Sequence, residues 1–134
     1  MRAEYAVAEF GRTLGMEDLS LHPMGQVRLG LPSGDWITLE EHLDDLVVSL
    51  VLHCPHVSAS ALLGALQLCD ARQHRGQRSF QVGLLGMGQE CAVVVATRML
   101  ADSASAQDIE TAVSDCTHWA HRWQSQSQVT MTGR

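Results

Sequence analysis

The chain of 134 residues contains no lysine, and all nine of its basic residues are arginine. These arginines are scattered, apart from the group Arg72, Arg75 and Arg78, and the formal net charge is −6. A protein that follows a nucleic-acid backbone needs a continuous basic stripe. The charge pattern therefore argues against nucleic acid as a partner and favours neutral or basic protein segments.

Long apolar runs are also missing. No run approaches the roughly 18 residues that a membrane span requires, and Glu4 and Glu9 interrupt the N-terminal stretch where an export signal would be apolar. We therefore expect a cytoplasmic protein that makes no membrane contact. The cysteines are dispersed, which argues against a disulfide framework. They are Cys54, Cys69, Cys91 and Cys116.

Metal-binding motifs are absent, although the chain has seven histidines. The closest pattern is Cys116-x-His118-x-x-His121, in which Cys116 falls on the apolar face of a predicted helix while both histidines fall outside it. The segment 53–56 (His-Cys-Pro-His) offers ligands at a strand end, but no second ligand cluster accompanies it. We therefore expect no metal and no other cofactor.

Motifs of catalysis are equally absent. The glycines at 83, 86 and 88 precede a strand, whereas a phosphate-binding loop must open a helix. The four carboxylates in 40–45 lack the glycine and the ligand register of a calcium loop, so we interpret this segment as a solvated turn between strands. The sequence has no GxSxG nucleophile motif. It predicts no enzyme.

Hydrophobic periodicity predicts one α+β domain in residues 1–123, followed by a polar mobile tail in 124–134. Tight turns make the neighbouring strands antiparallel, so we expect a five-stranded twisted sheet with three helices in the order α-β-β-β-α-β-β-α. The expected elements are a helix in 1–14, strands in 26–31, 36–40 and 46–53, a helix from Ser58 or Ser60 to about Gln73, a polar loop at 74–78, strands in 80–84 and 91–99, and a helix from Ser105 to Trp123. Gly15 is the predicted stop of the first helix, and Ser105 with Asp108 resembles a capping box at the start of the last one.

The second predicted helix has an apolar arc wider than one core contact requires. Leu63 and Leu68 extend the arc on either side of one apolar face, which consists of Ala61, Leu62, Ala65, Leu66 and Cys69. Apolar surface that accompanies no catalytic chemistry is typical of proteins that bind other proteins. The composition and the patterns together favour a binding protein.

The order of these elements and several local patterns resemble the small class I chaperones of bacterial type III secretion, the CesT/Tir-chaperone family. The resemblance covers about residues 3–123. The similar segments are the helix end and turn at 10–15, the lead-in 19–21, the strand 26–31, the leucine-rich helix 61–66, the strand pair 80–84 and 91–99, and a last helix ending in tryptophan. Residues 37–42 are similar to SycN-like members, which pair with a second small chaperone.

The resemblance implies a bacterial cytoplasmic protein without catalytic residues or cofactors. Such a chaperone binds the N-terminal segment of one or more secreted effectors in extended form and keeps it soluble and competent for export. It works as a homodimer, or as a heterodimer with a second small chaperone, and the export ATPase releases the effector.

Carried onto this chain, the resemblance assigns two sets of apolar residues. The effector-binding set is Val7, Phe10, Val27, Leu29 and Leu31. The dimer-interface set is Leu62, Leu63, Leu66, Phe80, Val82 and Leu84. Two alternatives stay open: a regulatory or adaptor protein of the same fold that binds a folded secretion regulator, and a metal-dependent enzyme that uses His118, His121 and an acidic residue.

Overall fold

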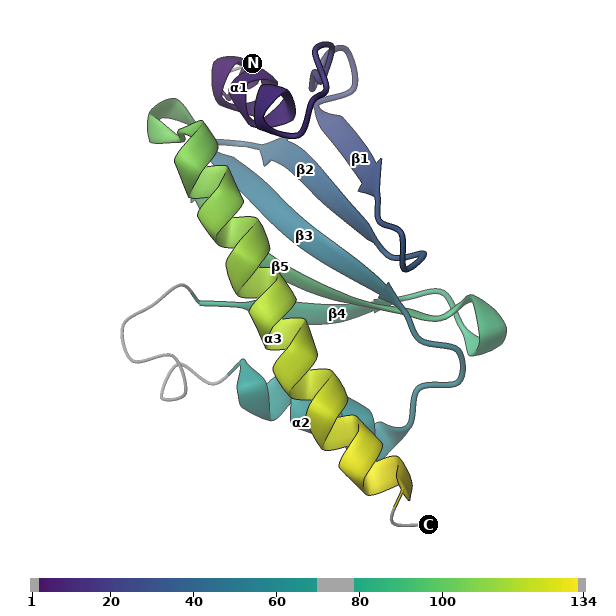
Figure 1. Cartoon of the computed structure of the whole chain (residues 1–134). Coiled ribbons are helices and arrows are strands. Elements are labelled where there is room, and N and C mark those ends of the chain that lie inside the picture. Colours follow the sequence, from purple (N-terminus) through teal and green to yellow (C-terminus); the bar gives the residue numbers. More distant parts are fainter. Residues whose placement is uncertain (1–2, 70–78, 133–134) are drawn as a thin grey trace.

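The computed structural model describes residues 3–69 and 79–132, and in them three α-helices accompany one five-stranded antiparallel sheet (Figure 1). The elements are α1 (Glu4–Thr13), β1 (Gln26–Gly30), β2 (Trp36–His42), β3 (Asp45–His53), α2 (Ala59–Leu68), β4 (Gln81–Leu85), β5 (Ala92–Leu100) and α3 (Ala106–Thr132). The predicted α+β class and the predicted order of elements are confirmed.

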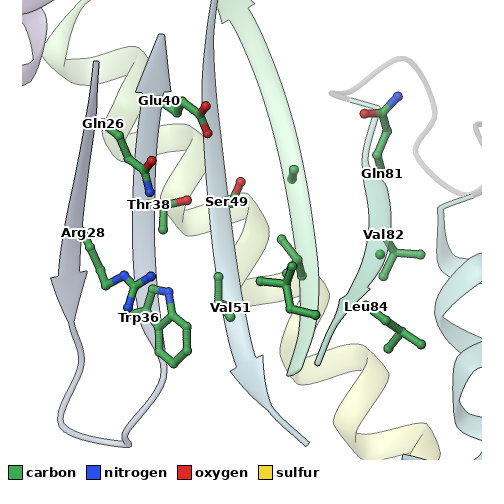
Figure 2. Close-up of a pocket in the computed structure, with 14 residues that line it drawn as sticks. Gln26, Arg28, Trp36, Thr38, Glu40, Ser49, Val51, Gln81, Val82 and Leu84 are labelled. Carbon is green, nitrogen blue, oxygen red and sulfur yellow. The ribbon is translucent and has the colours of Figure 1, made fainter. Parts of the chain in front are cut away.

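The strands lie in the order β1-β2-β3-β5-β4, so that β1 and β4 form the two edges of the sheet. Helix α3 crosses one face (Figure 1). Side chains alternate between the faces along each strand, and those of Leu46, Val48 and Val95 are buried in the core that contains the inner side of α3. Figure 2 shows the opposite face of the sheet, with α3 behind it.

Helix α3 begins at the predicted capping box. The Asp108 N–H donates to Ser105 Oγ at 3.1 Å, and the Ser105 N–H donates to Asp108 Oδ2 at 3.1 Å. Its inner side is buried through Ile109, Cys116 and Trp119, as the periodicity predicts. The sequence therefore located this helix start and this buried face correctly.

The same helix continues to Thr132, nine residues beyond the predicted end at Trp123. Extending an existing helix costs little, because each added residue gains a backbone hydrogen bond, and this does not require apolar periodicity. Helix α2 also lies alongside this part, since Gln126 Oε1 is 3.8 Å from the position that a Cβ would take at Gly64. Residues 124–132 are thus helical, and their mobility stays a prediction.

Helix α2 starts at Ser58, whose Oγ accepts the Ala61 N–H at 3.0 Å. It packs against α3 through the buried residues Ala65 and Leu68, and Trp123 Nε1 donates to Ala61 O at 2.7 Å. The helix ends at Leu68. The predicted extension toward Gln73 and the predicted loop at 74–78 lie outside the described residues.

The predicted acidic turn is shorter than expected. Residues 40–42 belong to β2 and Asp45 begins β3, so only Leu43 and Asp44 connect the two strands. The carboxylates are spread along strand ends, where Arg98 Nη1 lies 3.5 Å from Asp45 Oδ2. Polar residues are common both at strand ends and in turns. The composition alone therefore did not show where β2 ends and the turn begins.

Gly11 in α1 is required by a close approach of the chain. A Cβ at this position would lie 2.6 Å from Leu19 Cβ and 3.0 Å from Met16 O, where the segment after α1 folds back. We expect Gly11→Ala to lower the free energy of unfolding by about 1–3 kcal/mol through overpacking, measured by urea denaturation.

Gly64→Ala is the matched control in α2, because its Cβ would meet only Gln126 Oε1 at an ordinary distance of 3.8 Å. Alanine is the better helix former, so this variant should be unchanged or more stable. Equal stability of wild type and Gly11→Ala would contradict the role of Gly11.

Candidate protein-binding surfaces

A groove of about 620 Å³ lies between the end of α1, the edge strand β1 and the first half of α3. We call it the apolar groove. It is lined by Phe10, Leu14, Met16, Arg28, Leu29, Gly30, Leu31, Ile37, Glu110, Val113 and Ser114. Three segments that are distant in sequence therefore form one surface.

The rim of the apolar groove depends on how α1 ends. Gly15 has a φ of +79°, its N–H donates to Arg12 O at 3.0 Å, and the Met16 N–H donates to Gly11 O at 2.8 Å. This is a Schellman motif, which the predicted helix stop at Gly15 anticipates. The motif reverses the chain and leaves Leu14 52% exposed and Met16 41% exposed.

The floor of the groove is buried and apolar. Phe10, Leu29 and Ile37 are buried there, and Leu31 and Val113 are half-buried and pack against the core. Arg28 and Glu110 are the charged residues that line the groove, one from the strand and one from the helix. The groove can therefore take up apolar side chains, and opposite charges border it.

The outer edge of β1 lies beside the groove. Leu31 N–H donates to Asp35 O at 2.8 Å and Glu41 N–H donates to Gly25 O at 2.9 Å, which sets the hydrogen-bonded pairs of the β1–β2 ladder. By alternation, Gln26, Arg28 and Gly30 direct their backbone N–H and C=O groups outward. Within residues 3–69 and 79–132 no strand pairs with this edge.

A second apolar surface belongs to α2 and β4. Leu63 is 56% exposed and Leu66 is 59% exposed, and the leucines at 84 and 85 are exposed on β4. Both elements lie away from α1 (Figure 1). Because Ala65 and Leu68 are the buried residues of α2, its wide arc leaves Leu63 and Leu66 in solvent.

The uncovered face of the sheet carries a shallow hollow of about 380 Å³ that reaches from β1 to β4 (Figure 2). Its β1–β2 side is polar, and there the Arg28 guanidinium lies 4.7 Å from the centre of the Trp36 ring. Its β4–β5 side is lined by Leu84, Leu85 and Val94 among other residues. The exposed leucines of β4 thus border an apolar part of this face.

The structure brings part of each predicted set together. Of the effector-binding set, Phe10, Leu29 and Leu31 line the apolar groove, and Val27 is half-buried and packs against the core. Val7 is fully buried in the core, so it does not belong to the groove. A helix that covers a sheet edge must bury its inner face, and periodicity cannot tell that face from a binding face.

Of the dimer-interface set, Leu63, Leu66 and Leu84 are exposed. Leu62 and Val82 are half-buried and pack against the core, and Phe80 is buried in it. Three of the six predicted residues are therefore accessible to a partner. Leu85 was not among the predicted residues, and its exposure follows from its place on the edge strand.

Leu14, Met16, Glu110 and Val113 also line the apolar groove, although they were not in the predicted effector-binding set. The first two flank the predicted stop at Gly15, and an apolar residue on either side of a helix stop was a usable signal. The sequence contains no signal that would place Glu110 and Val113 of α3 beside β1.

The described residues contain no group of three or more His, Cys, Asp or Glu side chains placed to hold a metal. His118 and His121 are exposed on α3, whereas Cys116 is buried on its inner side. Burial raises the pKa of the Cys54 and Cys69 thiols, so both are mostly protonated at neutral pH. None of the helices in residues 3–69 and 79–132 combines the length and hydropathy needed to cross a bilayer.

No protein-family model and no curated protein matches the chain. Solved structures do match it. A chain of the HopA1–SchA chaperone–effector complex has a TM-score of 0.62 at 17% identity, over 90% of this chain and 91% of that chain. A chain of the ExsC–ExsE complex has a TM-score of 0.67 at 19% identity, over 90% and 89%.

A third match is to the heterodimeric complex ExoU–SpcU from the type III secretion system of Pseudomonas aeruginosa. Its TM-score is 0.51 at 13% identity, over 90% of this chain and 93% of that chain. At identities this low, the structural similarity establishes the fold alone. Membership of the CesT subfamily stays a prediction. The chain therefore has the fold of type III secretion chaperones, as the resemblance in its sequence implied.

Proposed function

We propose that this chain is a cytoplasmic type III secretion chaperone that binds the N-terminal segment of one or more secreted effectors in extended form. The observation that supports this proposal is the apolar groove beside the unpaired edge of β1. An extended segment is the ligand that can use both features at once. The chain acts by binding and performs no catalysis, and it needs no cofactor.

The backbone of the bound segment pairs with the outward N–H and C=O groups of Gln26, Arg28 and Gly30. Alternate side chains of an added strand point to one face of the sheet, where they enter the groove and cover Leu14 and Met16. Burial of apolar area drives the association, and the ordering entropy of the segment opposes it. The segment is thereby held unfolded and kept from aggregating.

Self-association through α2 and β4 belongs to the same proposal. Leu63 and Leu66 are too exposed to contribute to the core of their own chain, and a second copy would cover them. A homodimer then carries two apolar grooves, and a heterodimer with a second small chaperone is the variant suggested by the SycN-like segment 37–42. The export ATPase is the proposed agent of release.

A folded regulator is the alternative partner. It would need a broad complementary surface, whereas the apolar groove adjoins an open strand edge, which favours an extended segment. A metal-dependent enzyme has no support, because His118 and His121 belong to no ligand cluster within the described residues.

The test is co-expression with candidate effectors encoded at the same locus, followed by gel filtration with light scattering. We expect a stable complex of two copies of this chain with one effector N-terminal segment. A dimer that captures no unfolded segment but binds an intact folded regulator would shift the function to the alternative.

A further inference from the structure

Two cysteines face each other at the end of the central strand pair. The β3–β5 ladder ends at the pair His53 and Ala92, so Cys54 and Cys91 are the next residues outward. Their backbones remain paired, because the Cys54 N–H donates to Cys91 O at 2.9 Å. The register therefore places the two thiols opposite each other.

Side chains of directly opposed residues in an antiparallel pair point to the same face. Cys54 has the parity of Leu52, and Cys91 has the parity of Val93, both of which are buried in the core. A hydrogen-bonded antiparallel pair has its Cα atoms about 5.5 Å apart, within the range of about 4.4–6.8 Å that disulfides span. The Cβ atoms of such a pair need to approach by about 1–2 Å to reach disulfide geometry.

The two thiols differ in access. Cys54 is half-buried, whereas Cys91 is only 4% exposed. Burial raises the pKa of the Cys54 thiol, and the neighbouring Cys91 adds to the same shift. An oxidant therefore meets Cys54 first, and Cys91 is in position to react with the product.

We propose that Cys54 and Cys91 form a reversible intramolecular disulfide when the chain meets a peroxide. The Cys54 thiol loses its proton, the thiolate attacks one peroxide oxygen and the O–O bond breaks; the departing hydroxide takes up a proton and leaves as water, and Cys54 becomes a sulfenic acid. The Cys91 sulfur then attacks the Cys54 sulfur, the S–O bond breaks, and a second water leaves. Both electrons that reduce the peroxide come from the two thiols, and a small thiol reverses the reaction by exchange.

The disulfide would covalently link the segment between β3 and α2 to the residue that precedes β5. That connection already contacts the turn before β5, because the His56 N–H and the Cys91 N–H both donate to Gly88 O, at 2.9 and 3.2 Å. His53 Nε2 also lies 2.9 Å from Gln89 O. A covalent bond here closes a loop that contains α2 and β4, so the oxidised chain should melt at a higher temperature.

The test exposes the reduced protein to hydrogen peroxide, alkylates the remaining thiols under denaturing conditions, and maps the peptides by mass spectrometry. We expect a monomeric species that has lost two hydrogens, with a direct link between the peptides of Cys54 and Cys91. The rate should rise about tenfold per pH unit between pH 7 and 8, because the thiol with a raised pKa is mostly protonated there.

Cys69→Ser is the matched control, since Cys69 is also half-buried with a raised pKa and should leave the link intact. Cys54→Ser and Cys91→Ser should each abolish it. A link from Cys54 to another cysteine, or sulfinic acid at Cys54 without any link, would overturn the proposal. These readouts need neither an effector nor a dimer, so they stand apart from the proposed function.

Discussion

A chain with Leu63→Asp is expected to scatter light as a monomer at concentrations where the wild type is a dimer. Leu63 is exposed on α2 and does not support the core of its own chain, so the substitution should leave the fold unchanged. In a twofold dimer the residue occurs twice, and each copy would place an unpaired carboxylate in an apolar interface. Gel filtration with light scattering measures the mass, and circular dichroism checks the fold.

Gln107→Asp is the control for added charge, because Gln107 is an equally exposed helical position at the start of α3, away from α2. It should remain dimeric. An unchanged mass for Leu63→Asp would remove α2 from the interface. A monomeric wild type would remove the self-association proposal altogether.

Leu14→Asp is expected to weaken binding of the effector segment at least tenfold. Leu14 stands on the rim of the apolar groove, half exposed, where a bound segment would cover it. Full burial of a leucine side chain is worth about 1.5–3 kcal/mol, and covering the exposed half of Leu14 about half of that, which corresponds to roughly 4–12-fold in affinity. The desolvation of a carboxylate in that place adds to the loss. Isothermal titration with the segment identified by co-expression measures the change.

Leu43→Asp is the matched control for this variant. Leu43 is 86% exposed in the turn between β2 and β3, six residues along the chain from the groove residue Ile37. The control should bind like the wild type. Equal weakening by both variants would indicate a general effect of charge, and unchanged affinity of Leu14→Asp would place the segment elsewhere.

Local signals in the sequence predicted the fold well. The capping box at Ser105 and Asp108, the cap at Ser58 and the helix stop at Gly15 all act within a few residues of chain, so the sequence contains the whole of each signal. Alternation likewise predicted β1 and β4, because burial on one face imposes a period of two, and a run of β-branched and aliphatic residues predicted the largely buried β3.

The candidate surfaces were predicted only in part. Periodicity identified α1 and α2 as amphipathic, but it does not distinguish an apolar face that is buried from one that stays in solvent. Val7 entered the core, whereas Leu66, which the pattern placed on the inner arc of α2, is exposed beside the buried Ala65. The helix end at Thr132 was missed because helix propagation does not need an apolar stripe.

The sequence by itself determined the α+β class, the order of elements, the caps and the lack of a metal or catalytic motif, since these depend on residue type and short spacing. Tertiary structure alone decided that Leu14, Leu31 and Val113 share one groove and that Cys54 faces Cys91. Such juxtapositions depend on strand order and on how α1 and α3 pack against the sheet. Strand order and helix packing are determined by the burial of the whole core, which no short stretch of sequence encodes.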